Sequence, residues 1–179
     1  MEPPSETLVV RGAHVDAGER ELAEQLVSDL GGLPMFVPED KRTLYHAGLA
    51  HGANHLVTLV TQAMELLGAA GADDPAATLR PLLNAALDNA LAHGDAALTG
   101  PIVRGDVETV RAHVEVMART QPSALPSYVA LARATANTAV LDGRLLPIRA
   151  LKMRQVFDQA EAEAVEVTAG PTSEADPRG

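Results

Sequence analysis

Helical periodicity from residue 39 to about residue 165 is the feature that most restricts the fold of this chain. Its clearest run repeats at i, i+3, i+4 and i+7 and consists of Leu79, Leu82, Leu83, Ala86, Leu87, Ala90 and Leu91. Asp74 and Pro75 precede this run as a good N-cap and first helical residue. A chain of 179 residues can bury one sizeable core, or one and a partial second. The predicted fold is therefore mainly α, a helical bundle.

Four other helices are expected in the same region. They run over about residues 39–67, 106–119, 126–143 and 147–165. The first begins after Pro38 with acidic residues, which suit the positive end of a helix dipole. Asp106 caps the next one, and Gly143 stops the one after it.

The first forty residues have a different character. Residues 7–12 (TLVVRG) and 34–38 (PMFVP) read as short strands bounded by Gly or Pro. Between them a helix is predicted, with Asp16 as its cap, an apolar row of Leu22, Leu26 and Leu30, and a stop at Gly31-Gly32. Strand, helix and strand form one βαβ unit, which normally sits inside a larger parallel sheet. We expect the last piece of a sheet whose earlier strands are absent.

These patterns divide the chain into four parts. Residues 7–38 are the βαβ remnant, and residues 39–167 are the helical domain. Residues 1–6 and 168–179 are polar and rich in Pro, Gly and Ser, which predicts disorder.

Charge and composition exclude several classes of function. With 14 basic and 24 acidic residues the net charge is −10, which disfavours binding to nucleic acid or to anionic lipid. Aromatic residues make up only 2% of the chain and cysteine is absent, so base-stacking platforms and thiol chemistry are excluded. The sequence has no apolar run long enough for a membrane helix and no signal peptide. A cytoplasmic location is expected.

The segment KRTLYHAGLAHGANH carries the first candidate chemistry. Arg42 and His46 are four residues apart and share a helix face. Asn54 lies eight residues beyond His46, about 80° round and roughly 12 Å along an ideal helix. His46 is a candidate general acid or base, and Asn54 is a candidate for orienting a hydroxyl or carbonyl. The alternative is that Asn54 is a satisfied buried polar group and His46 pairs locally. Lys41 is a candidate catalytic lysine, or simply a solvated charge at the helix end.

His51 and His55 are also four residues apart, which is a metal-ligand spacing. The sequence offers no evident third ligand near them. No metal site is predicted.

The loop LTGPIVRGD is the second candidate. Gly100-Pro101 forces a turn, Thr99 offers a hydroxyl, and Arg104 precedes the helix that Asp106 caps. A helix N-terminus beside an arginine can hold a carboxylate or phosphate. The alternative is that Asp106 fills that position and Arg104 pairs with a neighbouring acid.

The segments TLYHAGLAHGANHLVTLV, LLNAALDNAL and ALTGPIVRGDVETVRAH together resemble one family. This is the helical C-terminal domain called domain of unknown function 2520, found behind a Rossmann-like NAD(P)-binding domain. The resemblance covers about residues 40–155. It implies a helical bundle of the 6-phosphogluconate dehydrogenase C-terminal type, and it implies that residues 7–38 are the end of the preceding Rossmann-like domain.

The resemblance also implies a function: an NAD(P)-dependent oxidoreductase of the 6-phosphogluconate dehydrogenase and ketopantoate reductase type. The helical domain of such enzymes supplies substrate contacts and usually the dimer interface, so a homodimer is expected. The substrate would be a small oxo-acid, such as a ketopantoate-like one. Asn54 matches the family's catalytic asparagine in kind, and His46 or Lys41 would protonate the alkoxide. Thr99 and Arg104, with Arg42 from the first helix, would contact the substrate.

The cofactor would be NADP or NAD in the full-length parent. This sequence contains no GxGxxG motif, so we expect the chain alone to bind no dinucleotide. The alternative to an enzyme domain is a non-catalytic helical module that dimerises or docks a partner.

Overall fold

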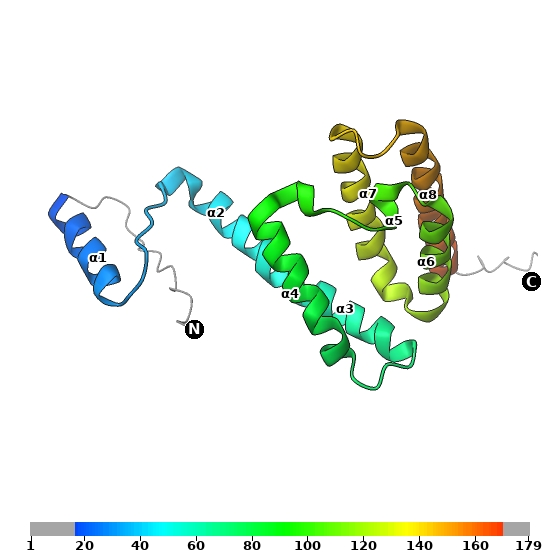
Figure 1. The fold of residues 1–179 in the computed structure, drawn as a ribbon, viewed down its shortest axis with the longest axis horizontal. Helices are drawn as coiled ribbons and strands as arrows, with labels where there is room; N and C mark the ends of the chain where they lie inside the picture. Colours follow the sequence, from blue (N-terminus) through cyan, green and yellow to red (C-terminus); the bar gives the residue numbers. More distant parts are fainter. Residues whose placement is uncertain (1–16, 170–179) are drawn as a thin grey trace, which may run out of the picture. The chain divides into compact units, whose positions relative to one another are not determined.

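The computed structural model describes residues 17–169, in which the regular elements are helices (Figure 1). The mainly helical fold predicted from the sequence is confirmed. The chain divides into two compact units, Met1–Thr58 and Leu59–Gly179, with the boundary inside helix α3 (His55–Ala69). None of the helices within the described range is long and apolar enough to cross a membrane.

Helix α1 (Ala17–Asp29) forms where the sequence predicts it, and glycines end it. Gly31 adopts a left-handed φ of 76°, which glycine tolerates because it lacks a Cβ. Its N–H donates to Ser28, and the N–H of Gly32 donates to Val27, the two hydrogen bonds of a Schellman motif. The predicted cap Asp16 lies outside the described residues. The apolar row Leu22, Leu26 and Leu30 is exposed, whereas Val27 is buried.

The predicted strand at residues 34–38 is not formed. Met35 makes only an isolated β-bridge, and residues on either side of it have no regular structure. A strand needs a continuous ladder, and Pro34 and Pro38 have no N–H to donate to one. The other predicted strand, residues 7–12, lies outside the described residues.

The predicted first long helix forms as a chain of four elements rather than as one uniform α-helix. These are η1 (Glu39–Lys41), α2 (Arg42–Leu49), η2 (Ala50–Asn54) and α3. The element η2 is a π-helical turn. The sequence pattern therefore predicted the helical path correctly, but it did not predict this interruption.

In the second unit, α4 (Pro75–His93) starts at the predicted cap. The Asp74 carboxylate accepts a hydrogen bond of 2.9 Å from the Ala77 N–H, and Pro75 occupies the first turn. None of the residues of α4 is buried, although the periodic leucines predicted a core-facing side. Its principal neighbour is the 3₁₀ turn η3 (Gly94–Ala97).

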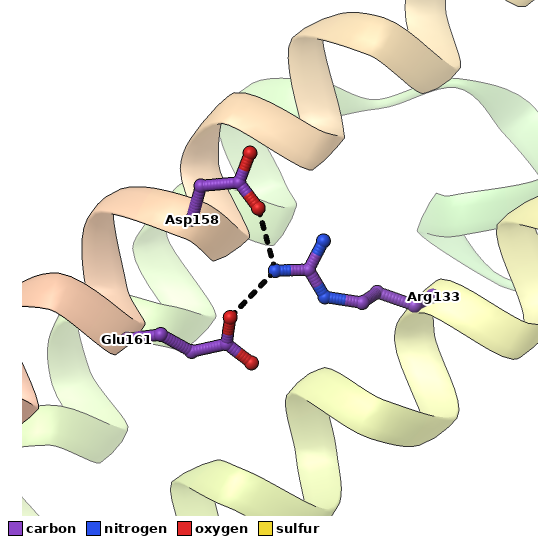
Figure 2. A network of polar contacts seen from close by, with 3 residues as sticks. All are labelled: Arg133, Asp158 and Glu161. Atoms are coloured by element: carbon purple, nitrogen blue, oxygen red, sulfur yellow. Dashed lines mark hydrogen bonds and ion pairs between the residues drawn. The ribbon is translucent and has the colours of Figure 1, made fainter.

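The core of the second unit lies among α6 (Val107–Thr120), α7 (Leu125–Leu141) and α8 (Pro147–Ala169), which pack side by side (Figure 1). The short helix α5 (Pro101–Arg104) precedes α6 and contacts α6 and α7, and the 3₁₀ turn η4 (Pro122–Ala124) connects α6 to α7. The main cluster of buried side chains consists of Val107, Val110, Val114, Met117, Ala124, Leu125, Val129, Ala132, Met153, Val156, Phe157 and Ala160. Arg133 of α7 crosses to Asp158 and Glu161 of α8 at the edge of this cluster (Figure 2).

The limits of the last helices agree closely with the pattern in the sequence. Gly143, at a φ of 73°, ends α7 as predicted, and α8 begins at Pro147. Residues 168 and 169 belong to α8, so the helix extends slightly into the segment predicted to be disordered. The remainder of that predicted tail and residues 1–6 lie outside the described range.

Candidate functional site

The π turn η2 is the most unusual local feature of the first unit. The backbone N–H of His55 donates to the carbonyl oxygen of Ala50, five residues earlier, where an α-helix would bond four residues earlier. Such turns are rare and occur frequently at functional sites. The turn spans the sequence AHGAN, so its residues apart from the histidine and asparagine are small.

This turn changes the angular relationship between His46 and Asn54. A π turn adds one residue to the helical path, so an eight-residue spacing across it corresponds to seven α-helical residues. Seven residues at 3.6 per turn bring the two positions within about 20° of each other and roughly 10 Å apart along the axis. The ideal-helix expectation of about 80° is thus corrected, and the two residues lie on nearly the same face.

Both side chains are exposed on this face. The alternative that Asn54 is a buried and satisfied polar group is wrong. In the part of the chain that the structure describes, neither His46 nor Asn54 has a hydrogen bond or ion pair to its side chain, so local pairing of His46 is not observed either. Both are available to a ligand.

Lys41 and Arg42 differ from His46 because each has an acidic neighbour. Lys41, in η1, forms an ion pair of 3.2 Å with Asp40, and both side chains are largely exposed. Arg42, at the start of α2, is held by Glu39 three residues earlier. Arg42 and His46 do share the α2 helix, as their spacing predicts. An anionic substrate would have to compete with Glu39 for Arg42.

The loop of the second candidate is built on two glycines with left-handed backbone. Gly100 has a φ of 96° and precedes Pro101 at the start of α5, and Gly105 has a φ of 73°. A Cβ at Gly105 would meet Leu145 Cδ1 at 3.2 Å and Arg149 Cγ at 3.3 Å. The predicted turn is confirmed, and the glycine after Arg104 is required by both its conformation and its close packing.

Asp106 fills the N-terminus of α6. Its carboxylate accepts from the Thr109 hydroxyl at 2.7 Å and from the Thr109 N–H at 3.1 Å. The side-chain hydrogen bond, followed by the backbone one, holds the pKa of Asp106 below its ordinary value. The helix end that the sequence offered as an anion site thus holds the protein's own carboxylate.

Thr99 and Arg104 are both exposed in this loop. Within residues 17–169 no ion pair forms at Arg104, so the predicted alternative of pairing with a neighbouring acid is not observed. These two residues belong to the unit Leu59–Gly179, whereas Lys41, Arg42, His46 and Asn54 belong to the unit Met1–Thr58.

Arg144 is a positioning residue that the sequence did not indicate. Its guanidinium donates to the carbonyl oxygens of Leu98 at 3.2 Å and Asp95 at 2.9 Å, and it pairs with Asp142. Arg144 thereby ties the turn after α7 to the start of the candidate loop. A single arginine after Gly143 carries no sequence signal for a contact with residues almost fifty positions earlier.

The second unit also contains an apolar cavity of about 400 Å³. It is lined by Leu66, Ala69, Ala70, His113, Val116, Met117, Thr120 and Tyr128. On one side of the cavity His113 Nδ1 lies 3.1 Å from the Tyr128 hydroxyl. Burial raises the pKa of Tyr128. This cavity contains none of the site residues predicted from the sequence.

The family of the chain follows from comparison with known proteins. Residues 9–135 match the family described as Domain of unknown function (DUF2520), so the chain belongs to this family. Membership of this family, which the TLYHAGLAHGANH and LTGPIVRGD segments predicted, is therefore confirmed. No curated protein matches the chain.

The fold is similar to that of a solved protein. The crystal structure of protein TM1727 from Thermotoga maritima matches with a TM-score of 0.62 and 20% sequence identity. The match covers 71% of this chain and 51% of that one, so the chain spans about half the length of its solved relative. At this identity the similarity concerns the fold alone.

Proposed function

We propose that this chain is the substrate-binding and dimerisation domain of an NAD(P)-dependent oxidoreductase that reduces a small oxo-acid, such as a ketopantoate-like one. The single observation that supports it best is the π turn, which aligns two exposed and unpaired polar side chains, His46 and Asn54, on one helix face. Ala50, four residues after His46, is small and leaves space between them for a ligand of a few carbon atoms.

The two side chains have complementary roles in carbonyl reduction. The Asn54 amide donates a hydrogen bond to the carbonyl oxygen of the substrate and so orients it. The His46 imidazolium donates a proton to the same oxygen as its negative charge develops, which is general acid catalysis and contributes about 10²–10⁴-fold to the rate. Lys41 is the alternative proton donor, but it would first have to leave Asp40.

The residues of this chain do not themselves fit the dinucleotide. Residues 17–169 contain no strand followed by a glycine-rich turn and a helix, the arrangement that holds a pyrophosphate. A net charge of −10 also opposes phosphate binding. The proposal therefore assigns NAD or NADP to a domain outside these residues, and it places the homodimer interface and the 6-phosphogluconate dehydrogenase-type bundle in this chain.

A second candidate is a non-catalytic helical module that dimerises or docks a partner. It is favoured by α4, which exposes Leu82, Leu87 and Leu91 by 66%, 49% and 79% and buries none of its residues. Leu87 and Leu91 are four residues apart and lie on one face of the helix, and this face of α4 is also the surface that we propose for dimerisation of the enzyme domain.

The test is calorimetric binding of NADPH and NADH, both to this chain and to a chain extended upstream in the gene. The proposal expects binding only by the extended chain, followed by oxidation of the cofactor with small oxo-acids. If neither chain binds either cofactor, the oxidoreductase proposal is wrong. The module would be favoured if the chain dimerises and binds no cofactor, and if replacement of His46 and Asn54 leaves its dimerisation unchanged.

A further inference from the structure

His51 and His55 face each other on the π-interrupted helix. Their Nδ1 atoms are 3.1 Å apart, and their rings meet edge to face with centroids 5.2 Å apart. Both side chains are exposed, and their contact is with each other. In the absence of an ion, one ring donates its Nδ1 proton to the other.

We propose that His51 and His55 form a chelating site for a divalent transition-metal ion of the copper, nickel and zinc class. The separation of the two nitrogens matches what a single ion requires. Imidazole nitrogens bind such ions at 2.0–2.1 Å, and two nitrogens 3.1 Å apart then subtend an angle of about 98° at the metal. This lies between the right angle of a square-planar site and the wider angle of a tetrahedral one.

Exposure allows the rings to adjust. In the hydrogen-bonded pair one nitrogen points at the other, whereas in a chelate both lone pairs must point at the ion. Because both side chains are exposed, the rings have room to rotate about their side-chain torsions to do this. The Nδ1 proton of the donor ring then resides on its Nε2, which is the tautomer that leaves Nδ1 free to bind.

The ligand set determines which ions bind. Neutral imidazoles favour copper, nickel and zinc, whereas calcium and magnesium require oxygen ligands. No group of three or more His, Cys, Asp or Glu side chains within residues 17–169 is arranged to hold a metal. The site therefore supplies two ligands and leaves the remaining positions of the ion to water or to a small ligand. Copper(II) should bind most tightly, since it stands highest in the general order of affinities.

The test is a calorimetric titration of the full chain with Cu²⁺ in a non-chelating buffer, with electron paramagnetic resonance on the same samples. We expect one Cu²⁺ ion per chain and a spectrum split by two nitrogen ligands. His51→Ala and His55→Ala should each weaken binding by about 100-fold, because a chelate becomes a single ligand. His93→Ala, which changes an exposed histidine at the end of α4, should leave the affinity unchanged.

Three results would overturn the proposal. The first is an affinity for Cu²⁺ that is the same in the His51→Ala/His55→Ala double variant as in the parent chain. The second is half an ion per chain, which would indicate that single histidines of two copies share the metal. The third is the absence of binding, with circular dichroism showing that the helices are intact. None of these readouts depends on oxidoreductase activity.

Discussion

The carbonyl oxygen of Ala50 accepts the N–H of His55, five residues later, and this hydrogen bond sets the side-chain directions on the first long helix. Because the turn takes up one extra residue, Asn54 follows His46 at an effective spacing of seven rather than eight. The turn thus brings onto nearly one face two side chains that would diverge on a uniform α-helix.

The first prediction follows from the proposed function and concerns this pair in the chain extended upstream in the gene. His46→Ala should lower kcat by about 10²-fold or more, because a general acid is lost from the transition state. Asn54→Ala should lower kcat/KM in the same assay, because the carbonyl is no longer oriented. The measurement is steady-state oxidation of NADPH or NADH with small oxo-acids.

Asn137→Ala is the matched control for this prediction, since Asn137 is an exposed asparagine on a different helix, α7. It should leave both kinetic constants unchanged. Equal activity of the extended protein with and without the His46→Ala substitution would show that His46 donates no proton in the reaction.

The second prediction concerns the candidate loop. Gly105→Ala should destabilise the protein more than Gly143→Ala, although both glycines have a φ of 73°. The shared left-handed conformation costs alanine about 1–2 kcal/mol in each variant. At Gly105 the new Cβ would also meet Leu145 and Arg149 at 3.2–3.4 Å, whereas at Gly143 there is no atom within 4 Å. Overpacking of this kind costs roughly 1–3 kcal/mol more.

Urea unfolding of the two variants, monitored by circular dichroism, measures this difference directly. A loss of stability that is equal in Gly105→Ala and Gly143→Ala would mean that the packing against Leu145 and Arg149 yields without cost.

The third prediction is a pH dependence that originates at Asp106. Hydrogen bonds from Thr109 lower its pKa in the folded chain, so the folded state holds the ionised carboxylate more firmly than the unfolded state does. The stabilisation is therefore present above the ordinary carboxyl pKa of about 4 and is lost as the pH falls through the lowered pKa. Asp106→Ala should reduce the urea midpoint at neutral pH, and its difference from the parent chain should shrink below about pH 4.

Asp73→Ala is the control for Asp106, because Asp73 is exposed and makes no side-chain hydrogen bond in the described part of the chain. It should shift the urea midpoint little at any pH. If Asp106→Ala lowers the urea midpoint by the same amount at neutral and at acidic pH, the capping role of the ionised carboxylate is contradicted.

The sequence predicted those elements whose signals are local. Asp74 and Asp106 cap the helices that follow them, and Gly143 ends α7, because each acts on backbone groups within a few residues. The π turn was missed because its hydrogen-bond pattern differs from that of an α-helix by only one residue. The spacing of the apolar residues in 39–67 is too irregular to reveal the insertion of a single residue. The strand at residues 34–38 was predicted wrongly because a strand depends on a partner elsewhere in the chain.

The candidate site was predictable only in its residue types. Exposure of His46 and Asn54, and the engagement of Arg42 by Glu39, depend on side-chain geometry that spacing leaves open. Arg144 was missed for a different reason, since its contacts to Asp95 and Leu98 join segments far apart in sequence. Long-range polar contacts have no periodic signature.

The last prediction weighs the polar contacts of Arg133 against the apolar core beneath it. The Nη2 atom of Arg133 donates to Asp158 and to Glu161, both at 2.7 Å (Figure 2). The guanidinium also lies 5.5 Å from the centre of the Phe157 ring. The hydrogen bond to Asp158 raises the pKa of Arg133. The carboxylate side chains are more than half exposed, so solvent screens both ion pairs.

Phe157, by contrast, is 1% exposed and belongs to the main core cluster. Phe157→Ala should cost about 3–5 kcal/mol of unfolding free energy, because it removes buried contacts and leaves a cavity. Arg133→Ala should cost only about 1 kcal/mol, and less in 1 M salt, since screened surface ion pairs contribute little. Urea unfolding at low and high salt measures both. If Arg133→Ala proves as destabilising as Phe157→Ala, the ion-pair network rather than apolar burial holds α7 to α8.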